Sequence, residues 1–236
     1  MYHQIDEPPP KGTRLRGSTV HPNRFASQMR WLKRLGYTGL SLSDLAPYIR
    51  GEKKGKVVGI TFDDGYQNVY ENALPILQQL GFSSTNFIVT GEISGENVWA
   101  QKTGSLPAKI MSIEQIRDWD AKGQEIGSHT INHIYVAKSQ PAVAQQQLID
   151  SKHTLEDILQ KEVPSFCYPY GDQSPQAREW VAQAGYQQAV STQRGLARAD
   201  DDLFALPRVN ILRSTHGLHF LRKVLTQYEE KKRAAK

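Results

Sequence analysis

The chain has 236 residues, of which 39% are hydrophobic and 22% are charged, and its formal net charge is +5. This composition predicts a globular protein with a hydrophobic core, in one large domain or two small ones. No apolar run approaches the roughly 20 residues that a membrane-spanning helix needs, so we expect no membrane span.

The charge distribution and the cysteine content limit the kinds of partner and covalent cross-link that we expect. Basic residues cluster at 53–56 and 231–236. Nucleic-acid binding would need basic residues interleaved with aromatic ones on one face. We therefore interpret both clusters as solvated surface and expect no nucleic-acid partner. Cys167 is the only cysteine, which excludes an intrachain disulfide.

The first residues, Met1 to Ile5, contain neither the basic nor the apolar region of a signal peptide. As it stands, the sequence predicts a cytoplasmic protein. An export segment omitted from it would instead place the protein at the cell envelope.

Strand-like and helical runs alternate along the chain. The expected strands cover residues 2–5, 57–62, 85–89, 124–127, 165–168, 187–190 and 206–211. The expected helices begin at residues 22, 68, 112, 141, 175 and 217. Repeated βα units predict an α/β fold with a mostly parallel sheet, closed or nearly closed into a barrel. We find no repeat or linker, so we expect a single domain over 1–236, with a flexible basic tail from about 230.

The strand at 57–62 leads into Asp63, Asp64 and Gly65 (VVGITFDDG). Apolar strands that end in acids and glycine place polar chemistry at the carboxyl edge of a buried parallel sheet. Two neighbouring carboxylates repel each other, so a nearby cation is needed to keep both ionised. A polar turn that caps the next helix is the alternative reading, but it uses only one aspartate.

Matching ligands follow the strand at 124–127, in Ser128 to His133 (SHTINH). His129 and His133 are four residues apart, which lets two imidazoles converge on one ion at about 2.0–2.1 Å. A set of two histidines and one aspartate leaves positions for water, as catalytic metal sites do. The sequence thus predicts a metal-dependent enzyme.

The segments TFDDG at 61–65 and SHTINH at 128–133 resemble the first two motifs of the NodB-type polysaccharide deacetylases, carbohydrate esterase family 4. The segment YPYG at 168–171 resembles the aromatic part of the third motif. The resemblance implies a distorted (β/α)7-type barrel and metal-dependent removal of acetyl groups, most often N-acetyl, from an N-acetylglucosamine-containing polysaccharide.

The same resemblance implies roles for individual residues. Asp63 is then the general base, and Asp64, His129 and His133 hold one divalent ion, Zn²⁺ or alternatively Co, Ni or Mn. The backbone N–H of Tyr170 would bind the oxyanion, while its ring, fixed by Pro169, would form one wall of the acetate pocket.

The chain also departs from the family pattern. Cys167 stands where the third motif commonly has an arginine that orients the base, and no fourth or fifth motif is recognisable. The chain shares these absences with the poly-N-acetylglucosamine deacetylase-like subset. That likeness suggests Arg208 as the partner of Asp63 and His3 as the general acid. His216 is the second candidate for the general acid.

Several readings compete at other positions. Trp119 falls on the apolar face of its helix and is expected in the core, whereas Trp99, in a glycine-rich loop, is a candidate substrate platform. Cys167 in an apolar strand is expected to be a buried packing residue rather than a nucleophile. The alternative functions are a metal amidase of the same fold acting on a small non-sugar amide, and a carbohydrate-binding relic.

Overall fold

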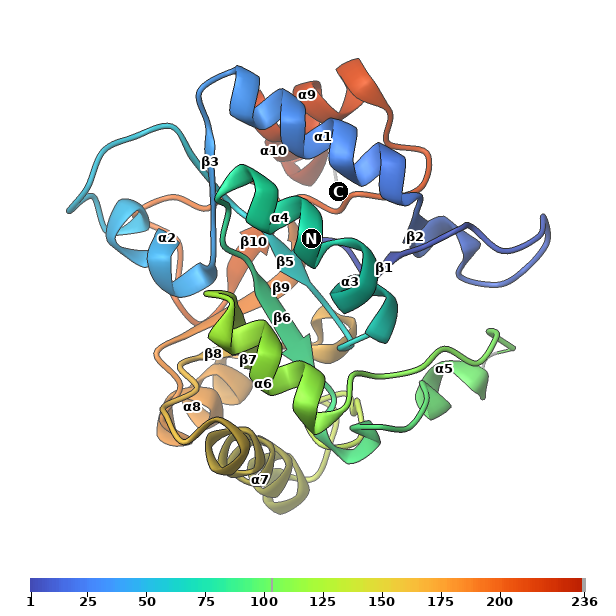
Figure 1. Ribbon diagram of the computed structural model, residues 1–236. Helices are drawn as coiled ribbons and strands as arrows, with labels where there is room; N and C mark the ends of the chain where they lie inside the picture. Colours follow the sequence, from blue (N-terminus) through green and yellow to red (C-terminus); the bar gives the residue numbers. More distant parts are fainter. Residues whose placement is uncertain (103, 235–236) are drawn as a thin grey trace.

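The computed structural model describes residues 1–102 and 104–234 and has at its centre a curled sheet of six parallel strands (Figure 1). The strand order is β10-β9-β8-β7-β6-β5. These strands are β5 (Thr61–Phe62), β6 (Thr85–Ile88), β7 (Glu125–Ser128), β8 (Ser165–Cys167), β9 (Gln188–Arg194) and β10 (Leu206–Arg208). The expected parallel α/β barrel is confirmed, as a half-barrel.

Two strand pairs extend the sheet. They are formed by β1 (Gln4–Ile5) with β2 (Thr19–Val20) and by β3 (Thr38–Leu40) with β4 (Val57–Gly59). Strand β4 continues after Ile60 into β5, and Tyr2 forms a parallel bridge with Phe62. The first strands therefore lie against the β5 edge of the half-barrel.

Helices surround the sheet, with α1 and α9 at one end of the view and α7 and α8 at the other (Figure 1). The helices are α1 (Pro22–Arg34), α2 (Leu42–Ile49), α3 (Gln67–Asn72), α4 (Leu74–Leu80), α5 (Val98–Gln101), α6 (Ile113–Ala121), α7 (Pro141–Leu159), α8 (Pro175–Gln183), α9 (Gly217–Leu225) and α10 (Tyr228–Ala234). Among the described helices, none combines the length and apolar character that crossing a bilayer requires.

Local sequence signals account for several helix boundaries. Ser112 accepts a hydrogen bond from the Gln115 backbone, and the Gln115 side chain accepts one from the Ser112 backbone, which completes a capping box at α6. Proline occupies the first helical position of α1, α7 and α8, where its missing N–H costs no intrahelical bond.

Several elements differ from expectation. The helix expected from 68 is split into α3 and α4 near Pro75, whose ring removes a backbone donor. The strand at 57–62 is interrupted at Ile60. Residues 228–234, which include the first part of the tail expected from about 230, form α10, in which Glu229 is 1% exposed.

The core lies between the sheet and its helices. Trp119 is fully buried, as expected, and its ring packs edge-on against Phe62 at 6.1 Å between centroids. Cys167 is also fully buried. Because all six strands of the main sheet are parallel, the residues that follow β5, β7 and β8 meet at one edge.

Candidate active site

The metal-ligand candidates meet where β5 and β7 end. Asp64 follows β5, and His129 and His133 follow β7, two strands away. Oδ1 of Asp64 lies 3.4 Å from Nε2 of His129 and 3.3 Å from Nε2 of His133. All three side chains are buried. The structure therefore brings the three predicted ligands together.

The spacing of these three atoms fits a metal ion. Ligands held at about 2.0–2.1 Å in tetrahedral geometry lie about 3.3–3.4 Å from one another. A direct charge-assisted hydrogen bond would be shorter, about 2.7–2.9 Å. One oxygen and two nitrogen atoms are also a donor set that Zn²⁺ and related ions accept. The residues present thus fit a single divalent cation.

The orientation of His129 supports the same reading. Its Nδ1 lies 2.7 Å from the carbonyl oxygen of Cys167. Since a carbonyl only accepts, Nδ1 is the donor, and the lone pair of a neutral ring lies on Nε2, facing Asp64. Burial lowers the pKa of His129, but Cys167 and Asp64 outweigh it and raise the pKa well above its usual value. A proton on Nε2 would therefore occupy the position between His129 and Asp64 until a metal ion displaces it.

His133 is held by aromatic rings. Trp99, on α5, stacks on His133 at 4.9 Å between centroids and 24° between planes, and Tyr170 packs edge-on against it at 4.5 Å. Tyr135 stacks in turn on Tyr170 at 4.0 Å and 13°. Sequence predicted a role at the site for Trp99 and Tyr170 but not for Tyr135. The position of Tyr135, two residues after the metal-ligand candidate His133, could have indicated that it lies near the site.

Asp63 is bound by Arg208. Nη1 and Nη2 of Arg208 donate to the two carboxylate oxygens at 2.6 and 2.8 Å, and both side chains are buried. Arg208 also donates to Thr61 Oγ1 at 3.1 Å and to the Ser191 carbonyl at 2.9 Å. The guanidinium is therefore fixed in one orientation between β10 and β5.

This pairing sets the charge of Asp63. Burial raises the pKa of Asp63, but the charge and hydrogen bonds of Arg208 outweigh it and leave the pKa below its usual value. Burial likewise raises the pKa of Asp64, but the neighbouring imidazoles of His129 and His133 outweigh burial and bring it well below the usual value. Both neighbouring carboxylates are thus ionised at neutral pH.

Cys167 occupies the space beside Arg208. Its Sγ accepts a hydrogen bond from Nη2 of Arg208 at 3.1 Å. Asp63, His129 and Cys167 form a second group of potential metal ligands, but Arg208 already binds both Asp63 and Cys167. Cys167 is therefore best described as a small buried residue that leaves room for Arg208. Its contact with Arg208 argues against a role as a nucleophile.

Backbone strain concentrates at this edge. The non-glycine residues with positive φ in the described chain include Asp64 (79°), Thr130 (65°), His133 (53°) and Tyr170 (59°). Such conformations cost about 1–3 kcal/mol each and persist where the surrounding structure fixes them. Gly171, next to Tyr170, has no room for a side chain, because a Cβ there would lie 1.9 Å from Thr192 Oγ1.

The two acid candidates lie in different places. His3 directly follows Tyr2, whose carbonyl oxygen accepts a hydrogen bond from the Asp63 backbone N–H at 3.0 Å. The buried Nδ1 of His3 has no hydrogen-bond partner within the described part of the chain. His216 is exposed at the N-cap of α9. The structure thus brings His3, and not His216, to the cluster.

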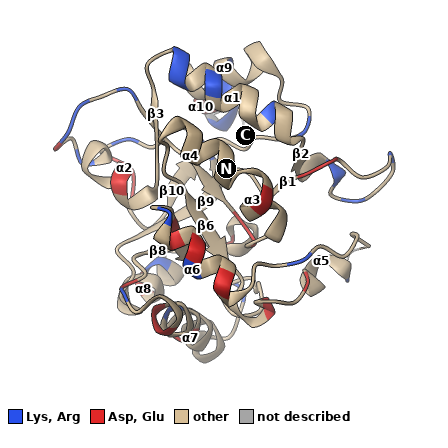
Figure 2. Cartoon of the chain, viewed as in Figure 1, with Lys and Arg blue, Asp and Glu red and all other residues tan. Residues whose placement is uncertain are grey.

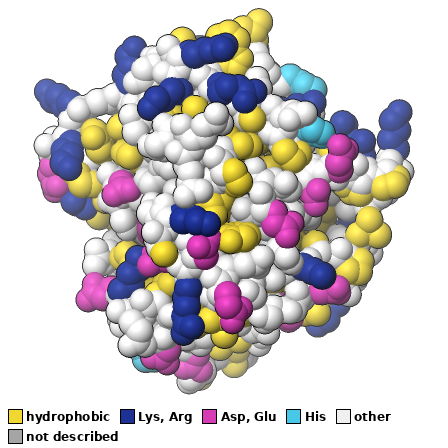
Figure 3. Space-filling view, in the orientation of Figure 1, with side chains coloured by type: hydrophobic (Ala, Val, Ile, Leu, Met, Phe, Trp, Pro, Cys, Tyr) yellow, Lys and Arg dark blue, Asp and Glu magenta, His cyan; other side chains and the backbone are white. Residues whose placement is uncertain are grey.

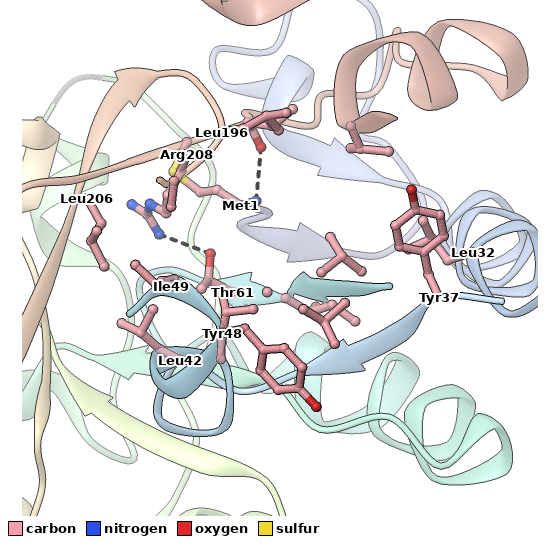
Figure 4. A pocket seen from close by; sticks show the side chains of 18 of the residues that line it. Met1, Leu32, Tyr37, Leu42, Tyr48, Ile49, Thr61, Leu196, Leu206 and Arg208 are labelled. Carbon is pink, nitrogen blue, oxygen red and sulfur yellow. Dashed lines mark hydrogen bonds between the residues drawn. The ribbon is translucent and has the colours of Figure 1, made fainter. Parts of the chain in front are cut away.

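One cavity borders Arg208, and a second lies beside Asn97. One of about 630 Å³ is lined by Met1, Thr61, Leu206 and Arg208 (Figure 4), but not by Asp63, Asp64, His129 or His133. The other, of about 460 Å³, is lined by polar side chains that include Gln4, Asn68 and Asn97. Asn97 also donates to the hydroxyl of Tyr66 at 3.4 Å. Burial and then Asp64 raise the pKa of Tyr66, but Asp63, Asp64, His129 and His133 do not line this polar cavity.

Comparison with known proteins gives consistent results. A sequence model of the family described as polysaccharide deacetylase matches residues 50–189. The putative polysaccharide deacetylase YxkH of Bacillus subtilis is 29% identical over 222 residues, which cover 93% of this chain and 73% of that protein. A poly-beta-1,6-N-acetyl-D-glucosamine N-deacetylase of Staphylococcus epidermidis is 26% identical over 231 residues, covering 92% of this chain and 76% of that protein.

A solved structure shares the whole fold. The Streptococcus pyogenes deacetylase PplD, solved in complex with acetate, matches with a TM-score of 0.82 and 27% identity. The match covers 95% of this chain and 96% of that one. The half-barrel is therefore a deacetylase fold from end to end.

Proposed function

Because the chain belongs to the polysaccharide deacetylase family (carbohydrate esterase family 4), whose members are hydrolases, we propose that it removes N-acetyl groups from an N-acetylglucosamine-containing polysaccharide in a metal-dependent reaction. The observation that carries the proposal is the placement of Asp63 beside the cluster of Asp64, His129 and His133. A site that only bound sugar would need no ionised carboxylate next to its metal ligands, which argues against a carbohydrate-binding relic.

The residues divide into those that hold a metal and those that move protons. When bound by Asp64, His129 and His133, a divalent ion would lower the pKa of a water molecule toward ~7 and polarise the acetyl carbonyl. Enzymes of this family are generally metalloenzymes, and we propose Zn²⁺, with Co, Ni or Mn as alternatives.

We assign the general base to Asp63. Arg208 keeps its carboxylate ionised, and each oxygen retains a second lone pair that can accept a proton from water. The backbone N–H of Tyr170 would donate to the oxyanion of the tetrahedral intermediate. Pro169 and the Tyr170 ring would form one wall of the acetate pocket. His3 would protonate the leaving amine, since it lies near both carboxylates.

The surroundings of the site favour a polymer over a small amide. Tyr170 is 46% exposed and Trp99 is half-buried, so aromatic rings flank an accessible site. The Staphylococcus epidermidis relative is named for poly-beta-1,6-N-acetyl-D-glucosamine, and we propose this class of polymer, at the cell envelope, as the substrate.

We also infer that residues 1–236 form one catalytic domain. The family model matches 50–189, yet His3 and Arg208 lie outside that range and contribute to the same cluster.

Acetate release tests the proposal. The purified chain would be stripped of metal and assayed on β-1,6- and β-1,4-linked N-acetylglucosamine oligomers and on peptidoglycan fragments, before and after Zn²⁺ is restored. We expect release only with metal, and faster on the β-1,6 oligomers. Turnover of a small cyclic amide but of none of the sugars would favour the amidase alternative.

A further inference from the structure

Acidic residues are unevenly distributed along the chain. The sequence has 24 Asp and Glu residues, yet residues 8–43 and 203–228 contain none. The same two segments hold seven and four Lys or Arg residues respectively. Of the latter, Arg208 and Lys223 are buried. The remaining cations are therefore not balanced by acids within either segment.

The structure places these two segments side by side. Helix α1 comes from the first and α9 from the second, and the two helices are in contact. Nε2 of Gln28 donates to the Thr215 carbonyl at 2.8 Å, and the Arg213 N–H donates to the Gly17 carbonyl at 2.8 Å. Figure 2 shows the result as a region around α1 and α9 in which charged residues are blue.

Apolar side chains are exposed in the same region. Leu218, in the first turn of α9, is 85% exposed, and Trp31 on α1 is 41% exposed. Arg30, Lys33, Arg34 and Arg222 are exposed on the same two helices. In Figure 3 the end of the molecule formed by these helices carries dark blue and yellow side chains without magenta ones. Lys33 binds the Leu80 carbonyl of α4, so we call Arg30, Trp31, Arg34, Leu218 and Arg222 the α1–α9 face.

We propose that the α1–α9 face binds the surface of a bilayer that contains anionic phospholipids. Cationic side chains near such a surface are attracted by its negative potential. Exposed Trp and Leu side chains can enter the boundary between headgroups and acyl chains. A soluble polyanion would use the cations but leave Leu218 and Trp31 in water, so the combination favours a lipid surface.

The reactive cluster takes no part in this binding. None of the residues assigned to metal binding or proton transfer belongs to the α1–α9 face. A protein bound in this way would keep its deacetylase site available to a polymer outside the bilayer, and its activity on soluble oligomers would not depend on lipid.

Vesicle co-sedimentation tests the proposal with the full chain. Vesicles of phosphatidylcholine with 30% phosphatidylglycerol (roughly the anionic range in which basic segments respond) would be compared with pure phosphatidylcholine. We expect binding only to the anionic vesicles, weakened as salt rises. Arg30→Glu with Arg34→Glu should weaken binding at least about tenfold, and Leu218→Ser should weaken it by a smaller factor.

Lys53→Glu with Lys54→Glu is the matched control, because it reverses two exposed cations in the loop before β4. This control should bind vesicles nearly as the unchanged chain does, and all variants should release acetate at the unchanged rate. Equal loss in the control would show a net-charge effect and overturn the proposal. Binding to soluble polyphosphate but not to anionic vesicles would overturn it as well.

Discussion

Arg208 reaches Asp63 across 145 residues of sequence and binds both of its carboxylate oxygens. The arginine stands at the end of β10 and the aspartate just after β5, the two strands that form the edges of the curled sheet. One ion pair therefore joins the two edges of the half-barrel and sets the charge of the proposed base.

Replacing Arg208 by lysine should slow the reaction more than it alters the fold. A lysine keeps the charge but cannot bind both oxygens at once, so Asp63 would lose orientation. We expect kcat to fall by about 10- to 100-fold, the equivalent of a charged hydrogen bond. Arg198→Lys, at an exposed arginine, serves as the control and should keep the original rate. Unchanged kcat in Arg208→Lys would show that the pair is not needed for turnover.

Asp63→Asn separates chemistry from metal binding. The amide has nearly the shape of the carboxylate but cannot take up a proton in the same way. Turnover should fall by about 10²–10⁴, while metal content measured by mass spectrometry should stay at one ion per chain. If the variant works at nearly the original rate, Asp63 has a structural role.

His3→Ala tests the proposed acid. Expulsion of an amine needs a proton, whereas an activated aryl acetate has a leaving group that needs none. The variant should lose far more activity on an N-acetyl sugar than on the aryl acetate, with unchanged metal content. Equal losses on both substrates would assign His3 to support of the fold.

Glu229 should anchor the C-terminal helix. It pairs with Arg194 at 2.6 Å and with Lys223 at 3.2 Å. Burial raises its pKa, but these two cations outweigh burial and lower it. The pair therefore stabilises the fold above the unfolded-state pKa of Glu229, and this stability is lost as pH falls through the folded-state value.

We expect Glu229→Gln to lower the free energy of unfolding in urea by about 1–3 kcal/mol at pH 7, with a smaller difference between variant and parent near pH 3. A difference that stayed constant over this range would contradict the ionic role of Glu229.

The features that depend on one short segment of the chain could be predicted from the sequence. Asp63, Asp64, His129 and His133 lie in two short segments at strand ends, so the parallel sheet alone was enough to bring them together. The capping box at Ser112 defined α6 in the same way.

Other features depend on contacts between distant segments. Strand β3 and helix α2 were not expected. Helix α2 is short and contains Pro47, and a proline inside a run of residues argues against a helix. The stacking of Tyr135 on Tyr170 joins the loop after β7 to the turn after β8, and neither segment alone indicates it. Arg208 was nominated by family resemblance, but its two-oxygen contact with Asp63 requires the curl of the whole sheet.

Metal content measured together with acetate release tests the central claim most directly. The parent chain should bind one divalent ion and release acetate from N-acetylglucosamine oligomers. His129→Ala combined with His133→Ala should lose both the ion and the activity, whereas His153→Ala, at an exposed histidine of α7, should keep both. One ion per chain retained in the double variant would contradict the assignment of Asp64, His129 and His133 as the metal site.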